Sequence, residues 1–87
     1  MLAGACAYLP SLDSTSVLRC WTGVRPATRD GLPLIGAHPS IDGVWVATGH
    51  EGLGITTCLA TAELLADQVE RRVPTLDAAP FAPARFA

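Results

Sequence analysis

The strongest constraint on the fold is an apolar stripe that repeats with helical spacing through residues 55–69. Members of the stripe stand three and four positions apart, which places them on one face of an α-helix: Ile55, Cys58, Leu59, Ala62, Leu65, Ala66 and Val69. Arg71 and Arg72 suit the negative end of the helix dipole, and Pro74 prevents the helix from continuing. We therefore predict a long amphipathic helix whose stripe faces a core.

Three segments before this helix have the composition of β-strands. Residues 16–25 are rich in β-branched and aromatic types and run up to Pro26. Residues 32–36 form a short second segment, in which Pro33 indicates an edge or a strand beginning. Residues 44–48 are apolar on both faces, which is typical of a strand inside a layered structure.

The two ends of the chain complete the predicted fold class, which is α+β. Residues 2–9 have the character of the last turns of a helix, stopped by the proline that follows. They are expected to be either the end of a longer helix or a piece that docks on another surface. Residues 73–87 are predicted to be an extended tail, anchored by Phe81 and Phe86. Three strands and one long helix do not close a core on both sides. We therefore expect residues 1–87 to be a single partial domain, as a fragment or a subunit.

Composition and charge exclude several classes of protein. The net charge is −2 and no basic run occurs, which argues against nucleic-acid binding and against a polybasic membrane patch. No segment approaches the roughly 20 apolar residues of a membrane span, and the start lacks the basic region of a signal peptide. Cys6, Cys20 and Cys58 have no spacing for zinc or a disulfide framework, so we expect reduced thiols in the core and no metal site.

A glycine-rich loop, GHEGLGITT, joins residues 44–48 to the predicted helix. Gly49, Gly52 and Gly54 follow the spacing G-x-x-G-x-G, which differs from the G-x-G-x-x-G of dinucleotide folds. Glycines let a backbone approach a ligand closely, and a helix N-terminus presents unpaired N–H groups with partial positive charge. Two interpretations remain: a site for an anion or polarised carbonyl, or a tight strand-to-helix turn.

Arg25 is the candidate for binding a carboxylate, because it ends a predicted strand beside Pro26, where its guanidinium is suited to a bidentate contact. A surface ion pair is the alternative. Arg29, in the turn that follows, is expected to be solvated. His50 either shuttles a proton or makes a structural hydrogen bond, and Glu51 either faces water or lies near a ligand.

No serine–histidine–acid set, metal-ligand spacing or lysine-bearing phosphate loop is present in the sequence, and His38, beside Pro39, is expected to be a loop residue. The residues therefore predict no catalytic side chain of their own. They support half of a binding site, made of an anion-favouring helix terminus and a candidate carboxylate clamp.

The runs W-x-G-x-R-P-x-T-x-D-G-x-P-x-I-G and G-H-x-G-x-G-I-T, in this order, resemble the C-terminal end of the FAD-dependent D-amino-acid oxidase, glycine oxidase and sarcosine oxidase family. The resemblance covers about residues 1–86. It implies oxidation of the CH–NH bond of an amino acid or secondary amine, by hydride transfer to flavin. It also implies a two-domain fold, with a Rossmann-like domain for the adenine half and a mixed-sheet domain over the flavin.

The same resemblance implies roles for individual residues. Arg25 would lie near the substrate carboxylate, with His50 and Glu51 as further substrate-binding candidates. The loop would pass along the pyrimidine edge of the flavin, with the following cofactor-binding residues: Gly49, Gly52, Leu53, Gly54, Ile55 and Thr56.

Two departures qualify the resemblance. Glu51-Gly52-Leu53 stands where glycine oxidase-like members carry another arginine, which favours the dehydrogenase-like branch of hydrogen cyanide synthase subunits and hydroxyproline or opine oxidoreductases. Without a signal peptide or a membrane span in the sequence, we expect a cytoplasmic protein. Members of that branch often work as multi-subunit, membrane-associated enzymes, which implies a position peripheral to the inner face of the cell membrane. The sequence also lacks the GxGxxG motif that holds the FAD diphosphate.

We therefore expect FAD to be shared with an FAD-binding N-terminal polypeptide or subunit, and activity only when that part is present. The alternative is a non-catalytic truncated remnant or a partner-binding module.

Overall fold

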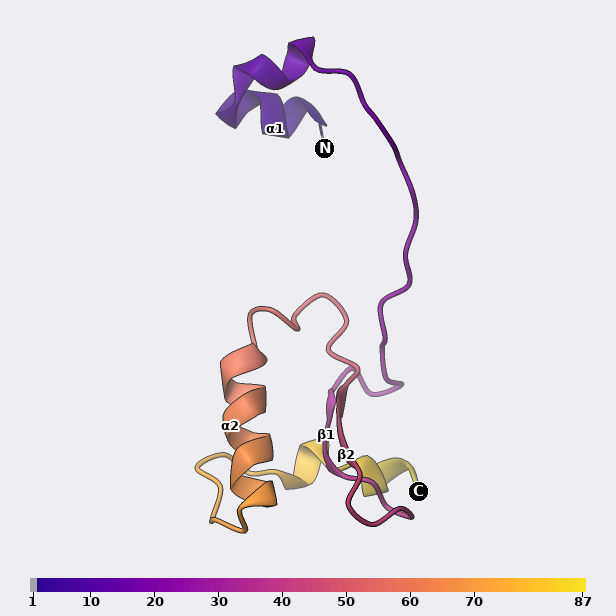
Figure 1. Cartoon of the computed structure of the whole chain (residues 1–87), viewed down its shortest axis with the longest axis vertical. Coiled ribbons are helices and arrows are strands. Elements are labelled where there is room, and N and C mark those ends of the chain that lie inside the picture. The colour runs from indigo at the N-terminus through magenta and orange to yellow at the C-terminus, as the bar shows by residue number, and fades with distance from the viewer. Residues whose placement is uncertain (1) are drawn as a thin grey trace.

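The computed structural model describes residues 2–87. Two helices, two strands and three short 3₁₀ turns follow one another along the chain (Figure 1). Their bounds are α1 Leu2–Tyr8, a turn at Pro10–Ser14, β1 Leu34–Ala37, β2 Trp45–Thr48, α2 Cys58–Val69, and turns at Ala79–Phe81 and Pro83–Phe86. Helix α1 and its turn lie at the end of a long arm, away from β1, β2 and α2 (Figure 1).

The strands β1 and β2 form an antiparallel pair in which Leu34 faces Thr48 and Ala37 faces Trp45. The amide of His38 donates to the carbonyl of Val44 at 2.8 Å, which extends the pairing toward the connecting loop. The structure thus confirms the second and third predicted strands to within about two residues at each end, the usual uncertainty of strand bounds.

The first predicted strand is absent, so the expectation of about three strands is wrong. Residues 16–25 belong to the long arm, and only Ala27 makes an isolated bridge, to His50. Leu18 and Val24 are each 99% exposed. Strand propensity reflects packing against neighbouring strands and burial, and no other strand among residues 2–87 lies beside this segment.

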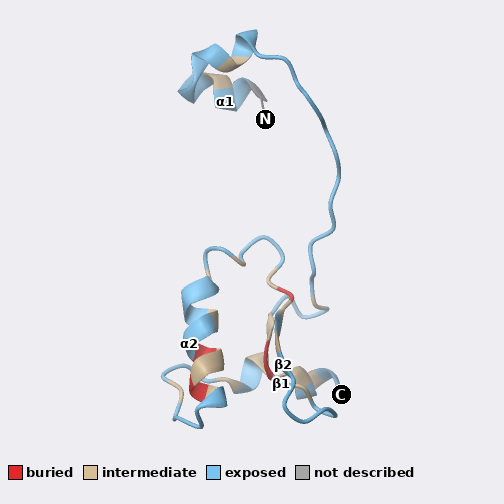
Figure 2. Ribbon diagram, viewed as in Figure 1, coloured by how far each residue is buried: buried red, intermediate tan, exposed pale blue. Residues whose placement is uncertain are grey.

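The predicted helix is present in part, because α2 begins at Cys58 and residues 55–57 belong to a turn, and it packs through a different face from the one predicted. Leu64 and Asp67 are buried on the side that faces β1, whereas Ile55 is 92% and Leu59 81% exposed (Figure 2). The residues of the predicted stripe therefore lie mainly on the outside. A two-stranded sheet can cover only one side of a helix, and here the connections of the chain turn the more polar side toward it.

Gly36 lies where β1, α2 and the tail meet. Its φ is +146°, and a Cβ built on it would lie 2.9 Å from Oε1 of Gln68 and 3.2 Å from Cδ of Pro83. Glycine is needed here because a side chain would collide with both neighbours and would strain the backbone. The absence of a Cβ lets the helix and the tail approach the strand closely.

The tail was predicted to be extended, but it forms two 3₁₀ turns that contact β1. Phe81 is half-buried and borders a hollow of about 180 Å³, whose wall includes Ile35, Leu64 and Leu76. Phe86 remains exposed, with 48% of its surface accessible. Phe81 therefore acts as an apolar anchor, and Phe86 does so only in part.

Arg85 holds the tail in place through hydrogen bonds. This residue was not singled out from the sequence. Its Nε donates to Oδ2 of Asp30 at 2.7 Å, and its Nη2 donates to Oδ1 of Asp30 at 3.1 Å. The same Nη2 also donates to the carbonyl of Leu32 at 2.7 Å. This two-point contact joins the C-terminal turn to the loop before β1, across 55 positions of sequence.

The cysteines do not lie in a core. Cys20 and Cys58 are exposed, and Cys6 is intermediate; all three are free thiols. The expectation of reduced thiols is met, but their predicted burial is wrong, because the described part of the chain buries only Ile35 and Leu64 among its apolar side chains. Among residues 2–87, no helix is long and apolar enough to cross a membrane, and no cluster of side chains is suited to a metal ion.

We predict that Gly36→Ala lowers the free energy of unfolding by about 1–3 kcal/mol, because the new methyl group overpacks the contact with Gln68 and Pro83. Urea denaturation followed by circular dichroism measures the change. Gly23→Ala is the matched control, since no atom lies within 4 Å of its built Cβ. Equal stability of the two variants would contradict the proposed close approach.

Acidification is expected to release the tail. The hydrogen bonds from Arg85, the largest effect, hold the pKa of Asp30 well below its ordinary value of 3.8, with smaller help from the amide of Leu32 and the hydroxyl of Thr28. A lowered carboxyl pKa stabilises the fold at pH above the ordinary value. That stabilisation is lost as the pH falls below 3.8 toward the pKa of the folded state.

An NMR titration of the Asp30 carboxyl carbon measures this pKa. Arg85→Leu should return it toward 3.8. An unchanged titration in that variant would show that the ion pair does not hold the tail.

Candidate functional site

The glycine loop, residues 49–57, leaves β2 through a buried residue, Gly49. Its φ is +81°, and a built Cβ would lie 2.8 Å from Cγ2 of Thr28. Only glycine combines this backbone with so close a neighbour at no steric cost. The sequence therefore places glycine where the loop must pass tightly beside the segment that carries Arg25.

Backbone contacts hold the loop against that segment. Ala27 and His50 form an antiparallel bridge, and the amide of Glu51 donates to the carbonyl of Pro26 at 3.0 Å. A Cβ built on Gly52 would lie 2.9 Å from Nη1 of Arg25. The two constellations that the sequence predicted separately, the arginine and the glycine loop, thus lie side by side.

The loop presents unpaired backbone donors beside Arg25. Its internal hydrogen bonds run from the amide of Leu53 to His50 and from the amide and hydroxyl of Thr57 to Leu53. Within residues 2–87, no hydrogen bond engages the amides of Gly52, Gly54, Ile55 and Thr56. Free amides ahead of α2, together with a guanidinium, favour an anion or an electron-rich carbonyl.

His50 is tied to the helix, with its Nε2 3.0 Å from Oγ1 of Thr61 in a partly buried contact. This geometry favours the structural interpretation of His50 over the proton shuttle. Thr61 was not identified from the sequence, because a threonine eleven positions along the chain carries no periodic or motif signal. The contact joins the glycine loop to the middle of α2.

Glu51 adopts a left-handed backbone, with φ of +51°, and its side chain is exposed. Its amide is used in the contact with Pro26, so the backbone strain accompanies the pairing of the loop. Glu51 is next in sequence to Gly52, and its carboxylate has no hydrogen bond or ion pair within residues 2–87. His38 is a loop residue, as expected, and its Nδ1 accepts from the amide of Ser40 at 3.1 Å.

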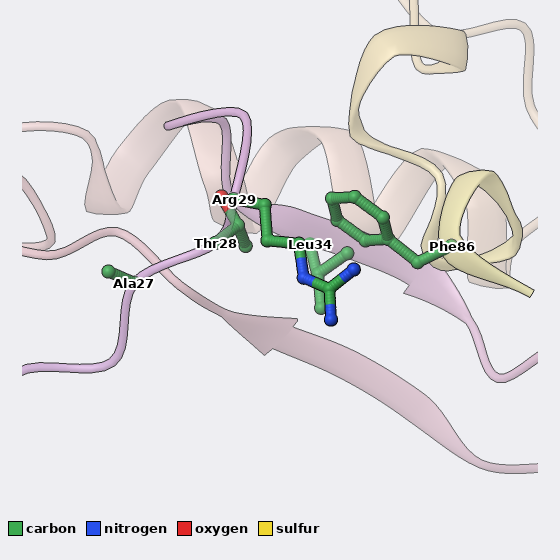
Figure 3. A pocket seen from close by; sticks show the side chains of 5 residues that line it. All are labelled: Ala27, Thr28, Arg29, Leu34 and Phe86. Atoms are coloured by element: carbon green, nitrogen blue, oxygen red, sulfur yellow. The ribbon is translucent and has the colours of Figure 1, made fainter.

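Arg29 lies outside this site. It borders a separate hollow of about 350 Å³, together with Ala27, Thr28, Leu34 and Phe86 (Figure 3). Its side chain extends over Leu34 toward the ring of Phe86 (Figure 3). Arg29 is exposed, as the sequence led us to expect, and within residues 2–87 it forms no ion pair.

Three comparisons show which known proteins this chain is similar to. A family model described as FAD dependent oxidoreductase matches residues 1–68. Glycine oxidase of Pseudomonas aeruginosa is 42% identical over 82 residues, which cover 94% of this chain and 22% of that protein. D-amino acid dehydrogenase 2 of Ralstonia nicotianae is 44% identical over 79 residues, covering 91% of this chain and 18% of that protein.

The fold has a counterpart among solved structures. The crystal structure of glycine oxidase from Geobacillus kaustophilus matches with a TM-score of 0.67 and 41% identity, over 93% of this chain and 22% of that chain. The chain thus spans about a fifth of the length of the relatives that it matches.

A double-mutant cycle tests the link between the loop and the helix. We expect Thr61→Val and His50→Ala to be coupled by about 0.5–1.5 kcal/mol, because either change removes the same hydrogen bond. Urea denaturation of the parent, the two single variants and the double variant gives the coupling energy. Additive effects would indicate that His50 and Thr61 act independently.

Proposed function

The chain belongs to the DAO family of FAD-dependent oxidoreductases, and from this membership we propose that it forms the flavin-facing and carboxylate-binding edge of such an enzyme. The reaction would oxidise the CH–NH bond of an amino acid or secondary amine. The observation that carries the proposal is the position of the Arg25 guanidinium beside Gly52, in a loop with unpaired amides.

The loop has the chemistry that a flavin edge requires. The amides of Gly52, Gly54, Ile55 and Thr56 are free to donate, while Gly49 and Leu53 shape the loop around them. Such donors, ahead of the positive end of α2, stabilise negative charge that develops on an acceptor. FAD, when bound, supplies the hydride acceptor. The backbone of this loop would tune that acceptor without any side-chain chemistry.

Arg25 would hold one end of the substrate. A guanidinium binds a carboxylate through two parallel hydrogen bonds, so it fixes orientation as well as position. Hydride loss from the carbon next to nitrogen, with loss of the nitrogen proton, gives an imino product that water hydrolyses. Glu51, which is exposed and next in sequence to Gly52, would disfavour a substrate with a second carboxylate, since like charges repel. His50 would support the loop through Thr61.

The diphosphate of FAD needs a further part of the family polypeptide. The sequence has no GxGxxG motif, and the chain matches about a fifth of the length of its relatives. We propose that a Rossmann-like part, in the same or another chain, completes the cofactor site. We also propose that the protein is located in the cytoplasm, either free or bound peripherally to the inner face of the cell membrane.

A chimeric enzyme tests this proposal. The full 87-residue chain replaces the 82 matching residues of the Pseudomonas aeruginosa glycine oxidase. We expect the purified chimera to be yellow, and its flavin absorbance to bleach under anaerobic conditions with an amino acid. Arg25→Ala should lower kcat/KM for amino acids by about 10- to 100-fold, because a charge-assisted contact worth about 1.5–3 kcal/mol is lost.

Arg29→Ala is the matched control, because it removes an arginine that lies outside the site. An amine substrate without a carboxylate should be oxidised equally well by the parent chimera and by Arg25→Ala. Equal losses for both substrate types would overturn the carboxylate role of Arg25. A folded chimera that binds no flavin would instead favour a non-catalytic, partner-binding module.

A further inference from the structure

The three glycines of the loop stand there for different physical reasons. Gly49 has a φ of +81°, in the left-handed region that favours glycine. Gly52 and Gly54 lie outside that region, so left-handed strain does not require glycine at either position. A Cβ built on Gly54 would lie 3.6 Å from Cβ of His50, which is an ordinary van der Waals contact. The glycine at position 52 therefore needs another explanation.

Gly52 leaves space that the side chain of Arg25 takes up. A Cβ built on Gly52 would lie 2.9 Å from Nη1 of Arg25, a separation that real Cβ atoms essentially never show. Apart from its chain neighbours, no second atom of the described residues lies within 4 Å of that position. The guanidinium thus lies against a bare backbone, where any side chain at position 52 would displace it.

Other contacts do little to restrain this guanidinium. Arg25 is exposed, and within residues 2–87 it takes part in no hydrogen bond or ion pair. An arginine side chain has several rotatable bonds, so a guanidinium without partners samples many positions. Packing against Gly52 narrows this range and keeps the guanidinium donors beside the loop.

We propose that Gly52 is a positioning residue for Arg25, and through Arg25 a determinant of specificity for substrates that carry a carboxylate. This proposal rests on the function proposed above. Non-bonded atoms pack at about 3.5 Å or more, so a Cβ on Gly52 pushes the guanidinium away by roughly half an ångström or more. A carboxylate bound to Arg25 moves with it. Gly52 thereby sets the distance between the substrate carboxylate and the loop amides that face the proposed acceptor.

NMR of the isolated 87-residue chain tests the contact itself. We expect nuclear Overhauser contacts between the side-chain protons of Arg25 and the Hα protons of Gly52. Gly52→Ala should shift the Arg25 Nε–H resonance and leave the urea midpoint unchanged, because only the end of a flexible side chain has to move. Absence of the contacts in the parent chain, or unfolding of Gly52→Ala, would overturn the positioning role.

Kinetics in the chimera test the consequence. We expect Gly52→Ala to lower kcat/KM for an amino acid about tenfold more than for an amine without a carboxylate, since small misplacements of an orienting group have effects of this order. The loss should appear mainly as a higher KM, because the bound substrate and the transition state both use the contact. Gly23→Ala is the matched control, since it adds the same methyl group near Arg25 in sequence, with no atom within 4 Å.

A double variant shows whether Gly52 acts through Arg25. In the Arg25→Ala chimera, adding Gly52→Ala should no longer discriminate between the two substrate types, because the group that it displaces is gone. A tenfold discrimination that persists without Arg25, or equal losses for both substrate types in the Gly52→Ala chimera, would assign Gly52 to the cofactor alone and overturn the proposal.

The outcomes separate this inference from the proposed function. A parent chimera that loses amino acid oxidation in Arg25→Ala but keeps it in Gly52→Ala would overturn the positioning role while the function stands. A parent chimera that binds no flavin would reject the function, and with it the specificity role of Gly52. The NMR contacts would then decide whether Gly52 positions Arg25 in this chain.

Discussion

The backbone pairing of Pro26 and Ala27 with His50 and Glu51 is the contact on which the candidate site depends. It is made by one bridge and one hydrogen bond of 3.0 Å between segments that are distant in sequence. The pairing places the Arg25 side chain against Gly52. The left-handed backbone of Glu51 accompanies this pairing. Without this pairing, nothing would hold the Arg25 side chain beside the amides of the loop.

Two further contacts hold the candidate site in place. His50 reaches Thr61 on α2, and Arg85 of the tail reaches Asp30 in the turn that follows the Arg25 segment. Both are polar contacts, whereas the apolar core of the described chain is confined to Ile35 and Leu64. The fold of this chain is therefore held by specific polar contacts around a very small core. Its large apolar side chains are mostly on the outside.

Several features were predictable from the sequence because they depend on local physics. The helix over Cys58–Val69 follows from spacing, and the two paired strands follow from β-branched residues between turn signals. The family followed from two long motifs, and the family model and the relatives confirm it. The contact of Arg25 with Gly52 was not predicted, since no local rule relates positions so far apart.

The sequence alone determined which segments are helical or strand-like and where the backbone needs glycine, because these depend on side-chain shape and on φ and ψ. Tertiary structure decided which segments pair and which face of α2 packs. Residues 16–25 have strand composition yet remain unpaired, since a strand requires a neighbour that residues 2–87 do not provide. The apolar face of α2 that includes Leu59 points away from the sheet because connectivity and the His50–Thr61 contact orient the helix, and periodicity alone does not encode that direction.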